Sequence, residues 1–197
     1  TRAITPLSLA GVAAVSFGWA GAGPAIMRGA MVSGLIEQLL TTPAWGALDY
    51  LVVDFPPGTG DIQLTLLQAA RFDGAVIVTT PQRLAYVDVA KGVRMFGRLG
   101  VPCLAVAENL AFFDAPDTGA RYTPFGAGAG AAVAADFGIP HLLAFPIDPA
   151  LSAAGDGGLP LVVSDPAGPV AARFQELGAA VVTEVARAAG APRARLE

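Results

Sequence analysis

The sequence contains one cysteine, Cys103, and one histidine, His141. A single cysteine excludes any disulfide within the chain and is compatible with a reducing compartment. Charged residues are also scarce, at 14% of the chain, and the formal net charge is −4. This charge gives no electrostatic reason to expect a nucleic acid or an anionic membrane surface as a partner.

Long hydrophobic runs are missing as well. No apolar run approaches the roughly 20 residues that span a bilayer, and the first residues, 1–4, lack the basic stretch and apolar core of a secretory signal. The chain is nevertheless 54% hydrophobic, with 24 Gly and 16 Pro among its 197 residues. That composition is too apolar for intrinsic disorder, and the length suffices for one α/β domain with a buried sheet.

Short apolar runs alternate with longer stretches that carry apolar residues at helical spacing, a pattern typical of βαβ units and a parallel sheet. Most of the runs are continuously apolar, as expected for strands covered on both faces. The predicted strands are residues 12–17, 50–55, 75–79, 103–107 and 142–145. The predicted helices are residues 31–40, 61–70 and 84–99, a helix opening at Asp165-Pro166 and ending near 188, and a small-residue helix after the loop at 126.

The most informative segment surrounds Asp54, which closes the predicted strand 50–55 and precedes a Pro/Gly turn. Ligands of open α/β sheets bind outside the carboxyl ends of the strands, so Asp54 lies where a ligand would bind. Such an aspartate is the usual Mg²⁺-side residue of P-loop NTPases. Gly58 and Gly60 let backbone N–H groups approach a phosphate. A second interpretation stays open, because Gly-rich strand-to-helix turns are common and Asp61 suits a helix N-terminus.

Residues 49–66, Asp-Tyr-Leu-Val-Val-Asp-Phe-Pro-Pro-Gly-Thr-Gly-Asp-Ile-Gln-Leu-Thr-Leu, are similar almost letter for letter to the signature of the Mrp/Nbp-type P-loop ATPases. That family belongs to the deviant P-loop class, which also contains the partition ATPases and the nitrogenase iron protein. Further matches follow in family order over nearly the whole chain. They are residues 25–33, 45–46, 78–82, 88–96, 108–109, 125–126, 145–148 and 155–160.

This resemblance implies a fold and a domain organisation. The fold is α/β, a mostly parallel sheet flanked by helices, the deviant P-loop NTPase (SIMIBI-type) fold, incomplete at its N-terminus. Residues 1–189 would be the C-terminal portion of the ATPase domain, and residues 190–197 a flexible tail.

The resemblance also assigns the phosphate side of the site. Asp54 would be the Mg²⁺-side aspartate, and Pro57, Gly58 and Thr59 would form the switch loop that faces the γ-phosphate of ATP. Asp54 and Gly58 would serve catalysis, with ATP and Mg²⁺ as cofactors.

On the base side, Asn109 corresponds to the family's base-recognising asparagine, and a carboxamide suits the N6/N7 edge of adenine. Pro146 and Asp148 fall in a second loop that the family places near the adenine ring. The residues alone leave other interpretations open. Asn109 also suits a turn after a strand, and Pro146 and Asp148 also suit a simple strand-ending turn.

The function that the resemblance implies is that of an ATP-dependent scaffold or carrier of iron–sulfur clusters, [4Fe–4S] in the parent protein, acting in Fe–S protein assembly. Residues 15–21, 122–126 and 138–142 resemble most closely a plastid branch of the family. The expected location is therefore the plastid stroma or the cytoplasm, without membrane attachment. The expected partners are client apoproteins and, in the full-length parent, a second copy of the protein.

Two departures from the family limit this interpretation. The deviant phosphate loop, Lys-Gly-Gly-x-Gly-Lys-[Ser/Thr], is absent, and so is a Cys-x-x-Cys after Asn109. We therefore expect the parent to hydrolyse ATP, this chain alone to be inactive, and no residue of the chain to ligate a cluster. Cys103 suits a small buried hydrophobe. Two alternatives stay open, a partition or positioning ATPase and a non-catalytic interaction remnant of the same fold.

Overall fold

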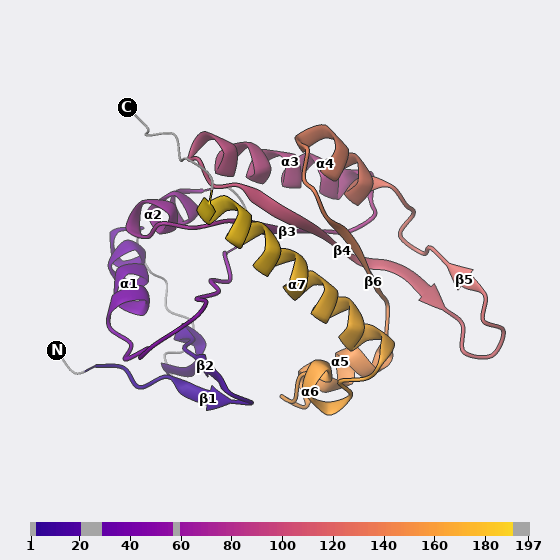
Figure 1. Cartoon of the computed structure of the whole chain (residues 1–197), viewed down its shortest axis with the longest axis horizontal. Helices are drawn as coiled ribbons and strands as arrows, with labels where there is room; N and C mark the ends of the chain where they lie inside the picture. Colours follow the sequence, from indigo (N-terminus) through magenta and orange to yellow (C-terminus); the bar gives the residue numbers. More distant parts are fainter. Residues whose placement is uncertain (1–2, 21–28, 57–59, 191–197) are drawn as a thin grey trace. The chain divides into compact units, whose positions relative to one another are not determined.

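The computed structural model describes residues 3–20, 29–56 and 60–190 (Figure 1). The chain divides into two compact units, residues 1–71 and residues 72–197. Each unit is described by itself. Pro57, Gly58 and Thr59, together with Arg28 in one of the family-like segments, lie outside the described residues.

Unit 1 contains a short hairpin and two helices. Strands β1 (Leu7–Leu9) and β2 (Val12–Ala14) pair antiparallel. The turn between them places Ala10 and Gly11 at positive φ, 50° and 82°, which is the backbone of a tight two-residue hairpin. The predicted strand 12–17 is therefore wrong in extent, because it ends at Ala14 and a 3-10 helix, η1 (Phe17–Ala20), follows it.

Helices α1 (Gly29–Thr41) and α2 (Asp61–Ala69) confirm the two helices predicted in this part of the chain. They pack against each other within unit 1. The predicted strand 50–55 is wrong, since these residues have no regular secondary structure. In the described part of unit 1 the only sheet is the β1–β2 hairpin. An apolar run forms a strand only where a neighbour satisfies its backbone N–H and C=O groups, and here Val52 remains 89% exposed.

Unit 2 is built on a sheet of four strands: β3 (Ala75–Thr79), β4 (Cys103–Asp114), β5 (Arg121–Tyr122) and β6 (Leu142–Pro146). Strand β4 is central and runs parallel to β3 and β6, while β5 pairs antiparallel with its far end. Helices α3 (Arg83–Arg98) and α4 (Ala129–Phe137) cover one face, and α7 (Pro169–Gly190) covers the other (Figure 1). The prediction of a parallel sheet flanked by helices is confirmed.

Side chains alternate between the two faces of β4, as the pleat of a strand requires. Val106 joins Ile77, Val93 and Val133 in the cluster under α3 and α4. Ala105 and Ala107 point to the opposite face, into the cluster with Leu143, Phe145 and Leu177 of α7. The methyl groups of these alanines leave room for α7 to lie directly on the sheet.

Strand β3 is an edge of this sheet in the described residues, since it pairs only with β4. Its side chains toward the α3 face are buried, as Ile77 shows with 7% exposure. The side chains that point the other way, Val76 and Val78, are 36% and 64% exposed. Helix α7 packs on β4 and β6 and so leaves β3 partly uncovered.

Two helices, α5 (Pro149–Asp156) and α6 (Leu161–Ser164), were not predicted. The predicted start of α7 at Asp165-Pro166 is also wrong. A turn in which Gly168 N–H donates to the Asp165 carbonyl follows α6, and α7 begins only at Pro169. The Asp-Pro capping signature acts earlier in the chain, where Asp148 Oδ1 accepts a hydrogen bond from Ala150 N at 2.7 Å and Pro149 occupies the first turn of α5.

The end of α7 is attached to the start of β6 by a side-chain contact between Glu184 and His141. Glu184 is buried, and its carboxylate lies 3.2 Å from His141 Nε2 and 2.8 Å from Arg187 Nη2. His141 immediately precedes β6, so this cluster holds the last turns of α7 against the start of that strand. Over the described ranges, none of the helices combines the length and apolar character needed to cross a membrane.

The packing of β4 makes a stability prediction. Val106 has no exposed surface, so Val106→Ala removes two buried methyl groups and leaves a cavity that costs about 2–3 kcal/mol of unfolding free energy. Urea unfolding followed by circular dichroism measures this loss. The control is Val182→Ala on α7, where the side chain is 47% exposed and a change within about 0.5 kcal/mol is expected. Equal losses in both variants would contradict the described core.

Candidate functional site

The carboxyl ends of the three parallel strands of unit 2 meet at one edge of the sheet. Thr79 of β3, Glu108 of β4 and Ala144 of β6 lie in register across it. Asn109 comes next on the central strand, and Pro146 and Asp148 follow the end of β6. The fold therefore brings the three base-side residues predicted from the sequence to the edge where open α/β sheets bind ligands.

Strand β4 bulges where Asn109 leaves the sheet. Glu108 pairs with Ala144 and Phe112 pairs with Pro146. Between these two pairs β4 advances by four residues and β6 by only two, so β4 contains two extra residues. Within this bulge Leu110 has a φ of 56°, a left-handed conformation that is rare for a residue with a side chain. The Asn109 side chain is exposed, and its Oδ1 accepts a hydrogen bond from Leu110 N at 2.9 Å.

The residue before the bulge, Glu108, joins β4 to helix α4. Its Oε1 accepts a hydrogen bond from Gly130 N at 2.7 Å, in the first turn of the helix. Gly128, the residue at the start of α4, has no side chain to cap the helix, so the Glu108 carboxylate takes that role. Its negative charge also interacts favourably with the positive end of the helix dipole. A Cβ on Gly130 would lie 2.8 Å from Glu108 Oε1, so a side chain there would displace the carboxylate from this position.

Beyond the bulge, the loop after β6 stays attached to β4. Ile147 N donates to the Phe112 carbonyl at 2.7 Å, and this bond fixes the loop between Pro146 and Asp148. The one contact described for the Asp148 carboxylate is the cap of α5. Its structural role is thus established, and its role beside a nucleotide stays a prediction.

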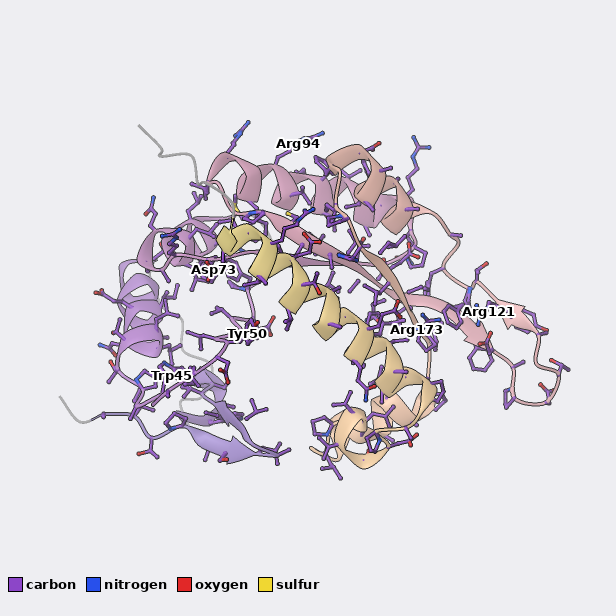
Figure 2. The ribbon with its side chains drawn as sticks, in the orientation of Figure 1. Trp45, Tyr50, Asp73, Arg94, Arg121 and Arg173 are labelled. Carbon is purple, nitrogen blue, oxygen red and sulfur yellow. The ribbon has the colours of Figure 1, made fainter. Side chains whose placement is uncertain are left out.

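The chain after the bulge forms an arm that sequence reasoning missed. Strand β4 continues to Asp114 and turns back through β5, where Arg121 forms two hydrogen bonds of 2.7 Å with the Asp114 carboxylate. The guanidinium also lies 3.7 Å above the Phe112 ring. Figure 2 labels Arg121 on this arm. The hydrogen bond from Arg121 lowers the pKa of Asp114. The signal in the sequence was an Asp and an Arg seven residues apart, which is too weak to predict a hairpin.

Unit 1 holds the residues that the sequence predicts for the phosphate side. Asp54 is exposed at the end of the irregular segment that precedes the Pro/Gly turn. Just beyond that turn, Gln63 of α2 is 3% exposed and its Nε2 donates to the Pro56 carbonyl at 2.8 Å. This buried amide fixes the chain at the entry to residues 57–59, and it was not predicted. Pro57, Gly58 and Thr59 themselves lie outside the described residues.

No group of three or more His, Cys, Asp or Glu side chains that could hold a metal ion occurs in the described part of the chain. Cys103 packs beside the core cluster under α3 and α4. Partial burial raises the pKa of its thiol to about 11. At neutral pH the residue is therefore almost entirely a neutral thiol, whereas metals bind the thiolate.

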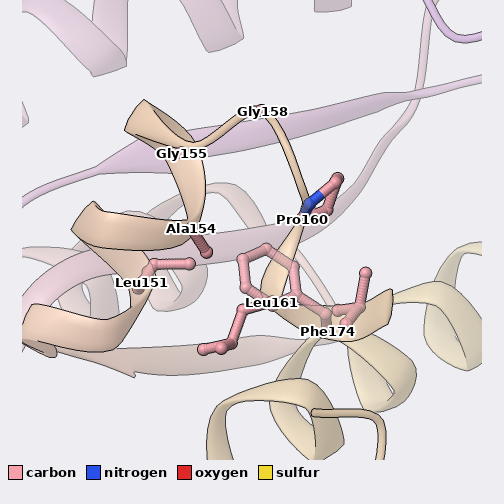
Figure 3. Close-up of a pocket in the computed structure, with 8 residues that line it drawn as sticks. Leu151, Ala154, Gly155, Gly158, Pro160, Leu161 and Phe174 are labelled. Atoms are coloured by element: carbon pink, nitrogen blue, oxygen red, sulfur yellow. The ribbon is translucent and has the colours of Figure 1, made fainter. Parts of the chain in front are cut away.

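A cavity of about 330 Å³ lies between α5, α6 and α7 (Figure 3). It is an open pocket lined by apolar and small residues: Leu151, Ala154, Gly155, Gly158, Pro160, Leu161, Val162 and Phe174. Phe174 also packs on Phe145 of β6, with ring centroids 4.7 Å apart. The lining lacks charged side chains, so this cavity does not suit a phosphate group.

Comparison with known proteins relates these features to a family. The model of the NUBPL iron-transfer P-loop NTPases, of the ParA group, matches residues 1–182. The chain is 62% identical over 187 residues to the chloroplastic Fe-S cluster assembly factor HCF101 of Oryza sativa subsp. japonica, which covers 95% of this chain and 35% of the relative. It is 46% identical over 154 residues to an iron-sulfur cluster carrier protein of Pseudomonas fragi, covering 78% of this chain and 54% of that protein.

Solved structures show the same fold. A nucleotide-binding protein from Archaeoglobus fulgidus, solved in complex with ADP, is 34% identical, with a TM-score of 0.68 over 80% of this chain and 62% of that chain. The cell division ATPase MinD of Pyrococcus furiosus, at 19% identity and a TM-score of 0.58 over 77% of this chain and 58% of that chain, supports the fold alone. The predicted P-loop NTPase fold and the resemblance to the Mrp/Nbp-type ATPases are both confirmed, and the chain belongs to the NUBPL-type iron-transfer P-loop NTPase family.

Proposed function

We propose that the chain is the base-binding and phosphate-sensing portion of an ATP-dependent scaffold or carrier that delivers iron–sulfur clusters to apoproteins. The chain spans only 35% of the length of its chloroplastic relative from rice. The observation that carries the proposal is the bulge of β4, which presents Asn109 at the carboxyl edge of a parallel sheet in a chain 62% identical to a cluster assembly factor.

The chemistry of Asn109 fits the adenine ring of ATP. A carboxamide offers one acceptor oxygen and one donor nitrogen, which match the N6 amine and N7 of adenine. A carbonyl-type oxygen has two lone pairs, so the bond from Leu110 N leaves Oδ1 able to accept a second hydrogen bond. Pro146 and Asp148 would border the base from the neighbouring strand, with Asp148 acting through the start of α5.

The phosphate side rests on Asp54 and the turn after it. The exposed carboxylate of Asp54 would hold Mg²⁺ directly or through a bound water, as hard cations prefer oxygen ligands. Pro57, Gly58 and Thr59 would form the loop that responds to the γ-phosphate, with Gly58 N–H groups facing it. The buried bond from Gln63 to Pro56 would anchor this loop on α2.

The 197 residues contain no phosphate loop of the Gly-Lys type. We propose that this loop belongs to a further part of the protein, which also supplies the phosphate lysine, and that the chain alone does not hydrolyse ATP. The cluster is cargo in this scheme. Its ligands would come from further segments or from a second copy of the protein, since the one thiol described here is a poor ligand.

The plastid is the proposed location, because both relatives at 62% identity are named as chloroplastic. We propose that the working form of the protein is a homodimer that carries a [4Fe–4S] cluster.

The proposed function is tested with the intact protein, in which this chain is joined to its phosphate loop. After anaerobic reconstitution with iron and sulfide, the visible absorption of a bound cluster is expected, followed by its transfer to an apo-ferredoxin of the [4Fe–4S] type. Nucleotide binding is measured in parallel by calorimetry. A protein that binds ATP but no cluster would indicate a positioning ATPase, and one that binds neither would indicate an interaction remnant.

The role of Asp54 makes a separate prediction. Asp54→Asn keeps the size of the side chain and removes its charge, so Mg²⁺-dependent ATP hydrolysis by the intact protein is expected to fall by about 10–100-fold. The malachite-green assay for released phosphate at varied Mg²⁺ measures this. The matched control is Asp49→Asn, an exposed aspartate five residues earlier, which is expected to keep the wild-type rate. Equal hydrolysis rates in both variants would show that Asp54 does not contribute to a metal site.

The role of Asn109 predicts a change in base preference. Asn109→Ala removes both adenine contacts, so the affinity of the intact protein for ADP is expected to drop by about tenfold or more, as for losing one or two hydrogen bonds. Its affinity for inorganic pyrophosphate, which has no base, is expected to stay the same. Isothermal titration calorimetry measures both affinities. An equal loss of affinity for pyrophosphate would mean that Asn109 stabilises the fold and does not bind the base.

A further inference from the structure

Helix α4 is capped from the end of the sheet and not by its own sequence. The usual capping residue is a Ser, Thr, Asp or Asn directly before the first turn. Here that position is Gly128, with a φ of 98°, and the capping oxygen belongs to Glu108, 22 residues before the Gly130 amide that it accepts from. A local cap would serve the helix alone, whereas Glu108 also attaches the end of the paired part of β4 to α4.

Helix α4 is a firm point of attachment. Val133 has no exposed surface and packs in one cluster with Ile77 of β3 and Val93 of α3. Farther along the helix, Asp136 Oδ2 accepts a hydrogen bond of 2.6 Å from Tyr86 of α3. Since α4 is held by the core and by its neighbouring helix, a bond to its first turn restrains the residue that makes the bond.

The segment that follows Glu108 depends on such restraint. Residues 109–111 pair with neither β3 nor β6 in the described sheet, and Leu110 is strained by its φ of 56°. A strained backbone of this kind persists only where its surroundings determine it. Its C-terminal flank is held by the bond of 2.7 Å from Ile147 N to the Phe112 carbonyl. The bond of Glu108 to α4 holds the N-terminal flank, so the bulge is fixed at both ends.

We infer that Glu108 is a positioning residue for nucleotide binding, which holds Asn109 at the carboxyl edge of the sheet through its bond to Gly130. This inference rests on the proposed base-binding role of Asn109. The Glu108 carboxylate is engaged with the helix, so it acts on the base through its neighbour. A site that is formed for only part of the time binds its ligand more weakly by that fraction. Contacts to the phosphates, which come from other residues, are not affected.

The first test replaces Glu108 in the intact protein and measures binding by isothermal titration calorimetry. Glu108→Ala is expected to bind ADP about three- to tenfold more weakly than the wild type. Glu108→Gln keeps an acceptor oxygen for Gly130 N, so its ADP affinity is expected within about twofold of the wild type. Pyrophosphate has no base, so both variants are expected to bind it as the wild type does, which also shows that they are folded.

Three outcomes of this test overturn the inference. They are an unchanged ADP affinity in Glu108→Ala, an equal loss in Glu108→Gln, and a loss for pyrophosphate as large as that for ADP. The proposed function fails separately, if Asn109→Ala itself leaves the ADP affinity unchanged.

The second test disturbs the same bond from the helix side. A Cβ at residue 130 would lie 2.8 Å from Glu108 Oε1, so Gly130→Ala displaces the carboxylate while Glu108 is kept. A loss of ADP affinity of about three- to tenfold is expected again. The control is Gly178→Ala on α7, an exposed position where a Cβ meets no described atom within 4 Å and no loss is expected. Combined with Asn109→Ala, Gly130→Ala is expected to cause no further loss, and a full additional loss overturns the inference.

A third measurement needs no variant. If the bond favours ADP binding, then ADP binding must favour the bond by the same factor, because the coupling between two equilibria is reciprocal. Hydrogen exchange at the Gly130 amide, followed by NMR, is therefore expected to slow by about three- to tenfold when ADP is bound and to stay unchanged with pyrophosphate. Exchange at Gly130 that ADP does not slow, or that pyrophosphate slows equally, overturns the inference.

Discussion

The structure of unit 2 depends on one constraint: the twelve-residue strand β4 is paired on both sides up to Glu108 and then runs beyond β3 and β6 to pair with β5. Strand β4 has parallel neighbours up to Glu108, and β3 ends there while β6 ends soon after. The mismatch between a long strand and its short neighbours is resolved by the bulge at Asn109 to Ala111. Bulges re-aim side chains where pairing ends, and this one turns an asparagine out of the sheet at the edge where ligands bind.

The same constraint explains the carboxylate that precedes the bulge. Glu108 is the last residue paired on both sides, and its alternation places it on the face covered by α4. There it satisfies a backbone N–H of a helix that begins with Gly128 and has no cap of its own. One residue thus joins the end of the regular sheet to the start of a helix, and a Cβ on Gly130 would displace its carboxylate. Site geometry and helix capping are therefore not independent here.

Much of unit 2 was predictable from the sequence, because its strands lie between covering helices. Continuous apolar runs predicted β3 and β6 within a residue, whereas the helix start predicted at Asp165-Pro166 was wrong, because α7 begins at Pro169. Residues 50–55 were predicted as a strand on equal grounds, yet local pattern carries no information about whether a pairing partner is present. Asn109, Pro146 and Asp148 were predicted as base-side residues from the family resemblance, and the structure places them at one edge of the sheet. Glu108, Leu110 and Gln63 were missed, since their roles arise from backbone bonds that no residue spacing reveals.

The uncovered margin of the sheet has a practical consequence. The outer side of β3 carries backbone donors and acceptors beside two exposed valines, Val76 and Val78. A flat apolar margin of this kind is a template for intermolecular ladders, and β3 carries neither a lysine nor a proline that would discourage them. Wherever this edge is left open, unit 2 is expected to associate edge to edge through β3.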